Sequence, residues 1–234
     1  MSLKRPGGFD ITRRGLEICN FKEGDKILDI GSGDGDTANF LYEEYSLIPT
    51  AIDLNAEKIG KAKEKFPHID FQIGDGEFLD GFSSRTFDGV LMECVLSEIN
   101  LPLEAVHEAY CVLKKGGKLL ISSLYWKALD DFNKKKVDEK VYDYQERHKQ
   151  GTLSEEEKET PPSTYVFNKV LLMDRLRPDV EKIGFKELLF EDRTYDLTTY
   201  AAEIIMKEGS LNDYVPEEAQ SKNTGYCLLV YEKL

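Results

Sequence analysis

Short apolar runs and helix-spaced apolar residues alternate along the first half of the chain. Five runs have the length and β-branched content of buried strands, at residues 27–30, 48–55, 69–73, 86–94 and 119–123. Between them, apolar residues recur at helical spacing in residues 38–45, 56–66 and 101–113. Strands that alternate with helices build βαβ units, so this half predicts an α/β fold with a parallel sheet.

The second half has a different pattern. Residues 126–151 are rich in charge but keep apolar residues at helical spacing, which predicts an amphipathic helix. The acidic run 155–157 and the pair Pro161–Pro162 then predict a mobile connector. The rest of the pattern predicts helices at residues 168–183 and 197–207 and strands at residues 186–192 and 225–231.

The first strand breaks into a loop with glycine at every second position. Gly31, Gly33 and Gly35 follow Asp29 directly after the apolar run, and a helical pattern begins just beyond them. Glycine accepts a positive φ and lets a ligand approach the backbone closely. The amide groups and dipole at the start of the next helix favour electron-rich ligand groups. We therefore predict a ligand-binding loop.

The spacing of this loop disagrees with the dinucleotide pattern G-x-G-x-x-G, because Asp36 stands where the third glycine is needed. The loop instead resembles the first motif of class I S-adenosylmethionine-dependent methyltransferases, D/E-x-G-x-G-x-G. The resemblance is to small-molecule members such as the ubiquinone and menaquinone biosynthesis methyltransferases. It implies S-adenosyl-L-methionine as the cofactor, with contacts from Asp29, Gly31, Ser32, Gly33 and Gly35.

Asp53 ends the second apolar run, at the offset where this kind of fold places a carboxylate on the ribose hydroxyls. A carboxylate can accept hydrogen bonds from both hydroxyls at once. Asp53 could instead cap the helix that follows, a role that Asn55 fills equally well. Leu54, between them, is predicted to contact the same cofactor.

Two further acids stand at the ends of apolar runs. In the family, an acidic residue just after the third strand lies beside the adenine, and Asp75 with Gly76 matches that position. Glu93 ends the fourth strand, and the residues after it are expected to face the transferred methyl group. Because ligands bind at the carboxyl ends of parallel strands, Asp53, Asp75 and Glu93 should lie at one sheet edge.

The resemblance also implies the architecture. We expect a Rossmann-like, doubly wound α/β sheet of seven strands, mostly parallel with an antiparallel last strand, and helices on both faces. Residues 1–234 would form a single methyltransferase domain. Within it, residues 1–24 would be an N-terminal helical cap over the cofactor, and residues 125–166 a helical lid insertion over the substrate pocket.

The expected reaction is methyl transfer to a small-molecule acceptor by in-line displacement. The sulfonium is already a strong electrophile, so the protein must chiefly align the acceptor and exclude water. If the acceptor must lose a proton, Glu93, Glu98 and Tyr125 are the candidates for the base, and each could equally be structural. Two alternatives stay open, a non-catalytic S-adenosylmethionine-binding sensor or accessory protein and an NAD-dependent oxidoreductase.

Composition narrows the partners. The 234 residues include 31 Lys and Arg against 44 Asp and Glu, and the net charge of −13 would repel a nucleic-acid backbone. The four cysteines form no C-x-x-C pair and no ligand spacing with the three histidines, so we predict free thiols, no metal site and a cytoplasmic location. No segment approaches the ~18 apolar residues of a membrane span. The oligomeric state stays unknown.

Overall fold

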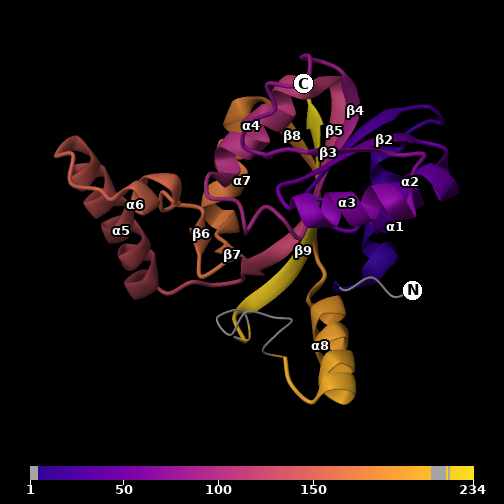
Figure 1. Ribbon diagram of the computed structural model, residues 1–234. Helices are drawn as coiled ribbons and strands as arrows, with labels where there is room; N and C mark the ends of the chain where they lie inside the picture. The colour runs from indigo at the N-terminus through magenta and orange to yellow at the C-terminus, as the bar shows by residue number, and fades with distance from the viewer. Residues whose placement is uncertain (1–4, 212–219, 221) are drawn as a thin grey trace.

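The computed structural model describes residues 5–211, 220 and 222–234 (Figure 1). Its elements are, in chain order, α1 (Gly8–Cys19), β1 (Lys26–Ile30), α2 (Asp36–Tyr45), β2 (Ile48–Asp53), α3 (Ala56–Lys65), β3 (Asp70–Ile73), β4 (Phe87–Glu93), α4 (Pro102–Val112), β5 (Leu113–Trp126), α5 (Asp131–Lys149), α6 (Glu155–Glu159), β6 (Val166–Phe167), β7 (Val170–Leu171), α7 (Met173–Ile183), β8 (Phe185–Asp192), α8 (Thr194–Glu208) and β9 (Thr224–Lys233). Among the described residues, no helix combines the length and apolar content needed to cross a lipid bilayer.

Strand β1 lies at the middle of a mostly parallel sheet. The parallel strands run in the order β3-β2-β1-β4-β5, with Ile30 opposite Ile52 on one side and Met92 on the other. Strand β9 returns antiparallel between β5 and β8. The predicted fold class is therefore confirmed, including the antiparallel last strand. The chain moves outward through β2 and β3 and then returns to β4, so the strand order switches beside β1, where α/β sheets bind ligands.

The predicted strand count is too low, because residues 166–171 form a small hairpin. Strands β6 and β7 pair with each other, and β7 joins the end of β5 through Tyr125 and Leu171. Asn168 and Lys169 form the turn between them with φ values of 50° and 57°. The helix predicted from residue 168 consequently begins only at Met173. Val-Phe and Val-Leu flanking a two-residue turn were the sequence signal for this hairpin.

Both faces of the sheet are covered, because successive side chains of each strand point to opposite faces. In β1, Leu28 and Ile30 pack in the cluster that includes residues of α4 and α7. Ile27 packs instead in the cluster formed with residues of α1 and α2. Helix α3 buries Ile59 and Ala62 against Phe71 of β3. By the same alternation Asp29 lies on the face of Ile27, towards α1 and α2.

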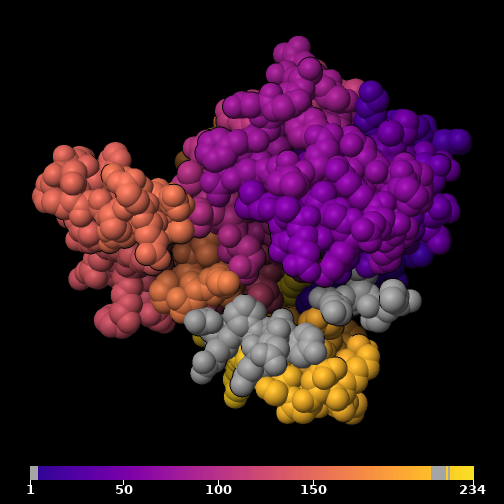
Figure 2. Space-filling view, in the orientation of Figure 1, coloured from indigo at the N-terminus to yellow at the C-terminus, as the bar shows by residue number. Residues whose placement is uncertain are grey.

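The segment after β5 is more ordered than its composition suggested. Strand β5 continues to Trp126, so Tyr125 lies within the strand rather than after it. The acidic run expected to be a mobile connector forms α6, which is held by a capping box between Ser154 and Glu157. Arg147 of α5 also pairs with Glu157 at 2.6 Å. Helices α5 and α6 project from the sheet as a lobe, seen at the left of Figures 1 and 2.

Candidate active site

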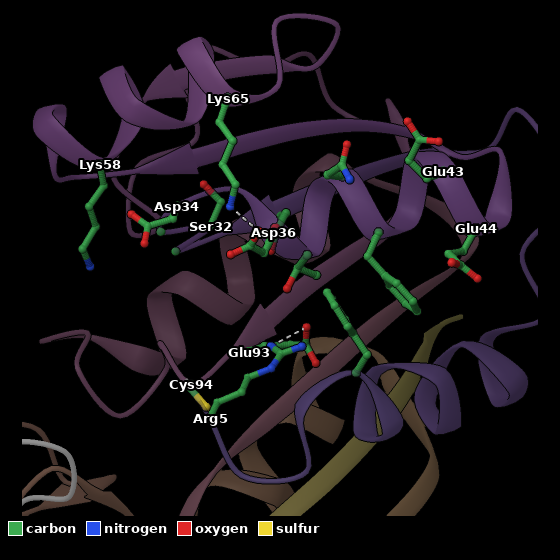
Figure 3. Close-up of a pocket in the computed structure, with 17 residues that line it drawn as sticks. Arg5, Ser32, Asp34, Asp36, Glu43, Glu44, Lys58, Lys65, Glu93 and Cys94 are labelled. Carbon is green, nitrogen blue, oxygen red and sulfur yellow. Dashed lines mark hydrogen bonds and ion pairs between the residues drawn. The ribbon is translucent and has the colours of Figure 1, made fainter. Parts of the chain in front are cut away.

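A cavity of about 700 Å³ opens at the carboxyl end of β1, beside the glycine loop and α1 (Figure 3). The loop is anchored because Gly31 and Ser32 both donate backbone N–H bonds to the Ile52 carbonyl, at 2.8 and 3.0 Å. Gly31 has a φ of 74°, and a Cβ there would lie 2.5 Å from Val95 Cγ2. Only glycine fits this position without strain. The loop therefore keeps its backbone exposed to the cavity.

The predicted cofactor residues divide between two neighbouring cavities. Five line the first: Asp29, Gly31, Ser32, Gly33 and Glu93. Gly31 is shared with a second cavity of about 440 Å³, which Asp53, Leu54, Asp75 and Gly76 also line. Gly35 lines neither cavity, because it packs so closely against α3 and β3 that a Cβ would lie 2.5 Å from the Phe71 ring. Its role is to bring loop and sheet together.

Asp53 joins the second strand to the glycine loop. Its carboxylate accepts hydrogen bonds from the Gly33 N–H at 2.9 Å and the Asn55 N–H at 2.8 Å. The cap of α3 is Asn55, whose side chain accepts from two backbone N–H groups of the first turn at 3.0 Å each. Of the two roles considered for Asp53, the helix cap is thus filled by its neighbour. Each Asp53 oxygen keeps a lone pair for a ligand hydroxyl.

The second cavity has an apolar rim. Leu54 is 68% exposed and Phe78 is 65% exposed, which is high for large apolar side chains. Both line the cavity, and Asp75 between them in sequence accepts a hydrogen bond from the Glu77 N–H at 2.9 Å. An exposed apolar pair beside a turn offers a surface on which a planar ring can stack. Sequence analysis missed Phe78, which stands two residues after the Gly-Asp-Gly turn, because nothing local marks it as exposed.

Glu93 forms a buried charge cluster with the N-terminal segment. Arg5 pairs with its carboxylate at 2.7 Å, and the Thr12 hydroxyl donates to it at 3.0 Å. Figure 3 shows Arg5 reaching across the floor of the first cavity to Glu93. Neither Arg5 nor Thr12 was a sequence candidate, because their position depends on how α1 docks on the sheet. No local pattern reveals that docking.

Asp29 is a buried acid without a partner for one of its oxygens. Its side chain points into the first cavity and is only 2% exposed, yet Oδ2 has no hydrogen bond. Burial, with help from the nearby Glu93 charge and against the effect of Arg5, raises the Asp29 pKa to about 7. Arg5 Nε and Ser32 Oγ are also buried and unpartnered in this cavity. Of five such atoms in the described part of the chain, three line this one cavity.

Both cavities are acidic. The first is lined by three basic residues and six acids, Asp29, Asp34, Asp36, Glu43, Glu44 and Glu93. The second is lined by Lys158 and five acids, Asp53, Asp75, Glu77, Glu98 and Glu159. A negative lining with unpartnered acceptors favours a cationic ligand that also carries hydrogen-bond donors. It disfavours a pyrophosphate.

The three candidates for a base are dispersed. Glu93 is held by Arg5 in the first cavity, whereas Glu98 lines the second and pairs with Lys169 at 3.1 Å. Tyr125 lines neither cavity, because its hydroxyl donates to Asp192 at 2.9 Å within the sheet. Burial and that carboxylate raise the Tyr125 pKa above its ordinary value, which makes it a poor proton acceptor at neutral pH.

Cys94 is a further polar group at the first cavity that sequence analysis did not select as a site residue. It follows Glu93 with a φ of 57°, unusual for a residue with a side chain. Its sulfur lies 2.8 Å from the Tyr226 hydroxyl, which in turn donates to Ser122 at 3.0 Å. Although Cys94 is exposed, desolvation by the surrounding atoms raises its pKa above the ordinary value.

The expectation that no histidine and cysteine share a ligand spacing is wrong. His107 and Cys111 stand one turn apart on α4, and with Glu108 they place one ligand atom each within 4.8 Å of one another. The sequence contained this spacing of four. Glu108 already accepts the Leu79 N–H at 2.9 Å. The group lies outside the two cavities described above.

Comparison with known proteins gives a family match for part of the chain. Residues 28–121 match the family model of a methyltransferase domain. This stretch, about two fifths of the chain, supports the resemblance to class I S-adenosylmethionine-dependent methyltransferases. The matched residues run from β1 into β5 and include the glycine loop, Asp53, Asp75 and Glu93.

Proteins that are similar in sequence match only part of the chain, whereas proteins that are similar in fold match nearly all of it. Demethylmenaquinone methyltransferase of Renibacterium salmoninarum is 33% identical over 99 residues, which are 42% of this chain and 41% of that protein. A crystal structure of the [4+2]-cyclase SpnF has a TM-score of 0.68 at 19% identity and covers 96% of this chain and 80% of that one. A structure of Haemonchus contortus phosphoethanolamine N-methyltransferase 2 has a TM-score of 0.67 at 18% identity and covers 97% of this chain and 53% of that one. It is in complex with phosphomonomethylethanolamine and S-adenosylhomocysteine. The chain thus shares its fold with proteins of different named activities.

Proposed function

We propose that the protein is a methyltransferase that uses S-adenosyl-L-methionine to methylate a small-molecule acceptor. The supporting observation is the buried, unpartnered Asp29 oxygen in the acidic cavity at the switch point of the sheet. A buried acceptor without a partner destabilises the protein unless a ligand donor satisfies it. S-adenosylmethionine brings an ammonium donor and, with its sulfonium, is a net cation.

The residues present fit this cofactor part by part. Asp29 would hold the ammonium group, and Arg5 the carboxylate through its unpartnered Nε. Asp53 would accept the ribose hydroxyls, and the adenine would lie between Leu54 and Phe78 with Asp75 at its edge. When bound, the cofactor supplies an electrophilic methyl group. The chain then has to orient the acceptor and exclude water, which requires no nucleophilic side chain.

The N-terminal segment and the α5–α6 lobe belong to this proposal. We infer that residues 1–24, of which 1–4 lie outside the described residues, form a cap over the first cavity. Phe9 of α1 lines that cavity, and so does Arg5, which pairs there with Glu93. We infer that residues 125–166 form a lid within one domain, because Lys158, Glu159 and Pro161 line the second cavity. All four cysteines are free, which supports a reducing, cytoplasmic location.

Titration calorimetry with S-adenosylhomocysteine and with NAD tests the cofactor assignment. We expect S-adenosylhomocysteine to bind and NAD to bind far more weakly, because acids line both cavities. Asp53→Asn keeps one acceptor oxygen for the Gly33 N–H but loses the negative charge. It should weaken the binding of S-adenosylhomocysteine at least tenfold. Asp70→Asn is the matched control on β3, where the acid bonds only to Gln72. Tight NAD binding, or equal effects of the two variants, would refute the assignment.

Transfer itself needs a separate measurement. Incubation with methyl-labelled S-adenosylmethionine and a panel of small amines, acids, phenols and thiols should label at least one acceptor. Binding of S-adenosylhomocysteine without labelling across the panel would favour the sensor or accessory protein. The SpnF fold neighbour is named as a cyclase, so the shared fold alone does not establish methyl transfer.

A further inference from the structure

A third cavity, of about 530 Å³, lies between the α5–α6 lobe and the loop that follows β4. It adjoins the second cavity, with which it shares Glu98, Ile99, Asn100 and Pro161. The loop residues 97–100 come shortly after Glu93 and Cys94, which line the first cavity. An acceptor in the third cavity would therefore sit beside the proposed cofactor site.

The third cavity has the opposite charge from its neighbours. Its charged lining residues are three lysines, Lys136, Lys140 and Lys169, against the single acid Glu98. In the first two cavities acids outnumber bases, and the whole chain carries a net charge of −13. A local excess of positive charge in an acidic protein concentrates anions at that place.

The lysines of α5 differ according to the direction they face. Lys134, Lys135 and Lys149, which do not line the cavity, pair with Asp174, Glu139 and Glu146. Lys136 and Lys140 line the cavity one turn apart, and neither has an ion pair within the described part of the chain. The Lys136 ammonium lies 4.4 Å from the centre of the exposed Phe132 ring, and neither ammonium is neutralised by an acid among the described residues. Both can therefore still bind an anionic group.

Apolar side chains complete the lining. Val137 between the two lysines is buried, and Val166 and Phe167 of the β6–β7 hairpin face the same space. Lys169 closes the hairpin side through its pair with Glu98 at 3.1 Å. The cavity thus offers cationic groups on one helix and an apolar wall opposite them. This combination suits a ligand with an anionic end and an apolar body.

We propose that the third cavity binds the methyl acceptor, and that the acceptor is a small molecule with a phosphate monoester or carboxylate group attached to an apolar portion. The inference rests on the proposed methyltransferase function. Opposite charges then separate the two substrates, because the cationic cofactor is drawn to the acidic cavities and the anionic acceptor to the basic one. Lys136 and Lys140 hold the anion, and the apolar wall positions the body of the acceptor.

The test is titration calorimetry with phenyl phosphate, benzoate and neutral benzyl alcohol, all in saturating S-adenosylhomocysteine so that the cofactor cavities are filled. We expect at least one anionic probe to bind at least tenfold more tightly than benzyl alcohol. The double variant Lys136→Gln/Lys140→Gln should weaken that probe at least tenfold, or about 1.4 kcal/mol. The matched control, Lys135→Gln/Lys149→Gln, removes the same charge from the same helix outside the cavity. It should change the affinity less than twofold.

Each outcome is decisive. Binding that is equal for charged and neutral probes, absent for both anions, or equally affected by the two double variants would overturn the inference. The exposed positions of all four lysines keep every variant folded, which thermal unfolding would verify. S-adenosylhomocysteine binding is measured in the same samples. If S-adenosylhomocysteine does not bind, the proposed function is refuted. If it binds but the anionic probes do not, only the proposed acceptor class is refuted.

Discussion

Replacing Asp29 with Asn should make the ligand-free protein more stable and its function poorer. The substitution preserves the shape of the side chain and removes a buried charge. Burial raises the Asp29 pKa from its ordinary 3.8 to about 7, with the Glu93 charge acting in the same direction and Arg5 opposing it. One pH unit corresponds to about 1.36 kcal/mol, so ionised Asp29 destabilises the folded protein by about 4 kcal/mol.

The sign of the pH dependence follows from where the proton sits. Below pH 3.8 both the folded and unfolded chains hold it, and Asp29 contributes nothing. Between pH 3.8 and about 7 only the folded protein holds it, so the free energy of unfolding falls as the pH rises. Above about pH 7 the carboxyl is ionised in both states, and the destabilisation is complete.

Urea unfolding of the ligand-free wild type and Asp29→Asn at about pH 5.5 and about pH 8.5 measures this effect. The stability advantage of the variant should grow by about 2 kcal/mol between the two pH values. Asp34→Asn is the control, because it removes an exposed acid from the same loop. A stability difference between Asp29→Asn and the wild type that is the same at both pH values would refute the argument.

The same residue should act oppositely on cofactor binding. Rising pH ionises Asp29, so the wild type should bind S-adenosylhomocysteine more tightly at about pH 8.5 than at about pH 5.5. Asp29→Asn should bind it more weakly and lose this pH dependence, since a hydrogen bond to a charged group contributes about 1.5–3 kcal/mol. Titration calorimetry on the samples used for unfolding checks both. A variant that is stabilised and binds as well as wild type would exclude Asp29 from the cofactor site.

Three further substitutions test the surroundings of the site. Gly31→Ala should abolish S-adenosylhomocysteine binding and lower the free energy of unfolding by about 1–2 kcal/mol from its positive φ alone. Val95→Gly should partly rescue it, because it removes all three Val95 side-chain atoms that the new Cβ would meet, Cβ at 2.7 Å included. Glu93→Gln should lower the free energy of unfolding by about 3–5 kcal/mol, because it leaves the buried Arg5 without its charged partner. A double variant that replaces both Arg5 and Glu93 with neutral residues should recover most of this loss, as measured by urea unfolding. Ser154→Ala should remove about 1 kcal/mol of capping, seen as faster amide hydrogen exchange in α6 with global stability unchanged.

The sequence predicted the architecture well where periodicity is strong. The apolar run around Ile27 and Leu28 identified β1, and the alternation of side chains along the strand decides which of them meets each face of the sheet. It predicted less in the second half, where charge dominates the composition. There the capping box at Ser154 was present in the sequence but was outweighed by the acidic run. The β6–β7 hairpin was missed because two-residue strands carry almost no periodic signal.

For the site, the sequence identified residues whose chemistry is local. Gly31 and Asp53 stand at fixed offsets from a strand, and the structure places both at the cavities. Arg5 and Phe78 were invisible for a physical reason. Arg5 reaches Glu93 only because α1 packs back on the sheet, and Phe78 is notable only because it is left exposed. Contacts between segments far apart in the chain follow from packing, which single-sequence patterns do not encode.

Charge connects the proposals into one argument. A chain with a net charge of −13 has an acidic surface by default, so its acidic cavities alone could reflect composition. Two departures from that background carry the information. Asp29 is buried where its charge destabilises the fold, and Lys136 and Lys140 have no acid partner among the described residues, whereas neighbouring lysines of α5 pair with acids. Features that reduce stability locally are typical of binding sites, since the ligand later supplies the missing partner. A cationic cofactor would supply the missing partner of Asp29, and an anionic acceptor would pair with Lys136 and Lys140.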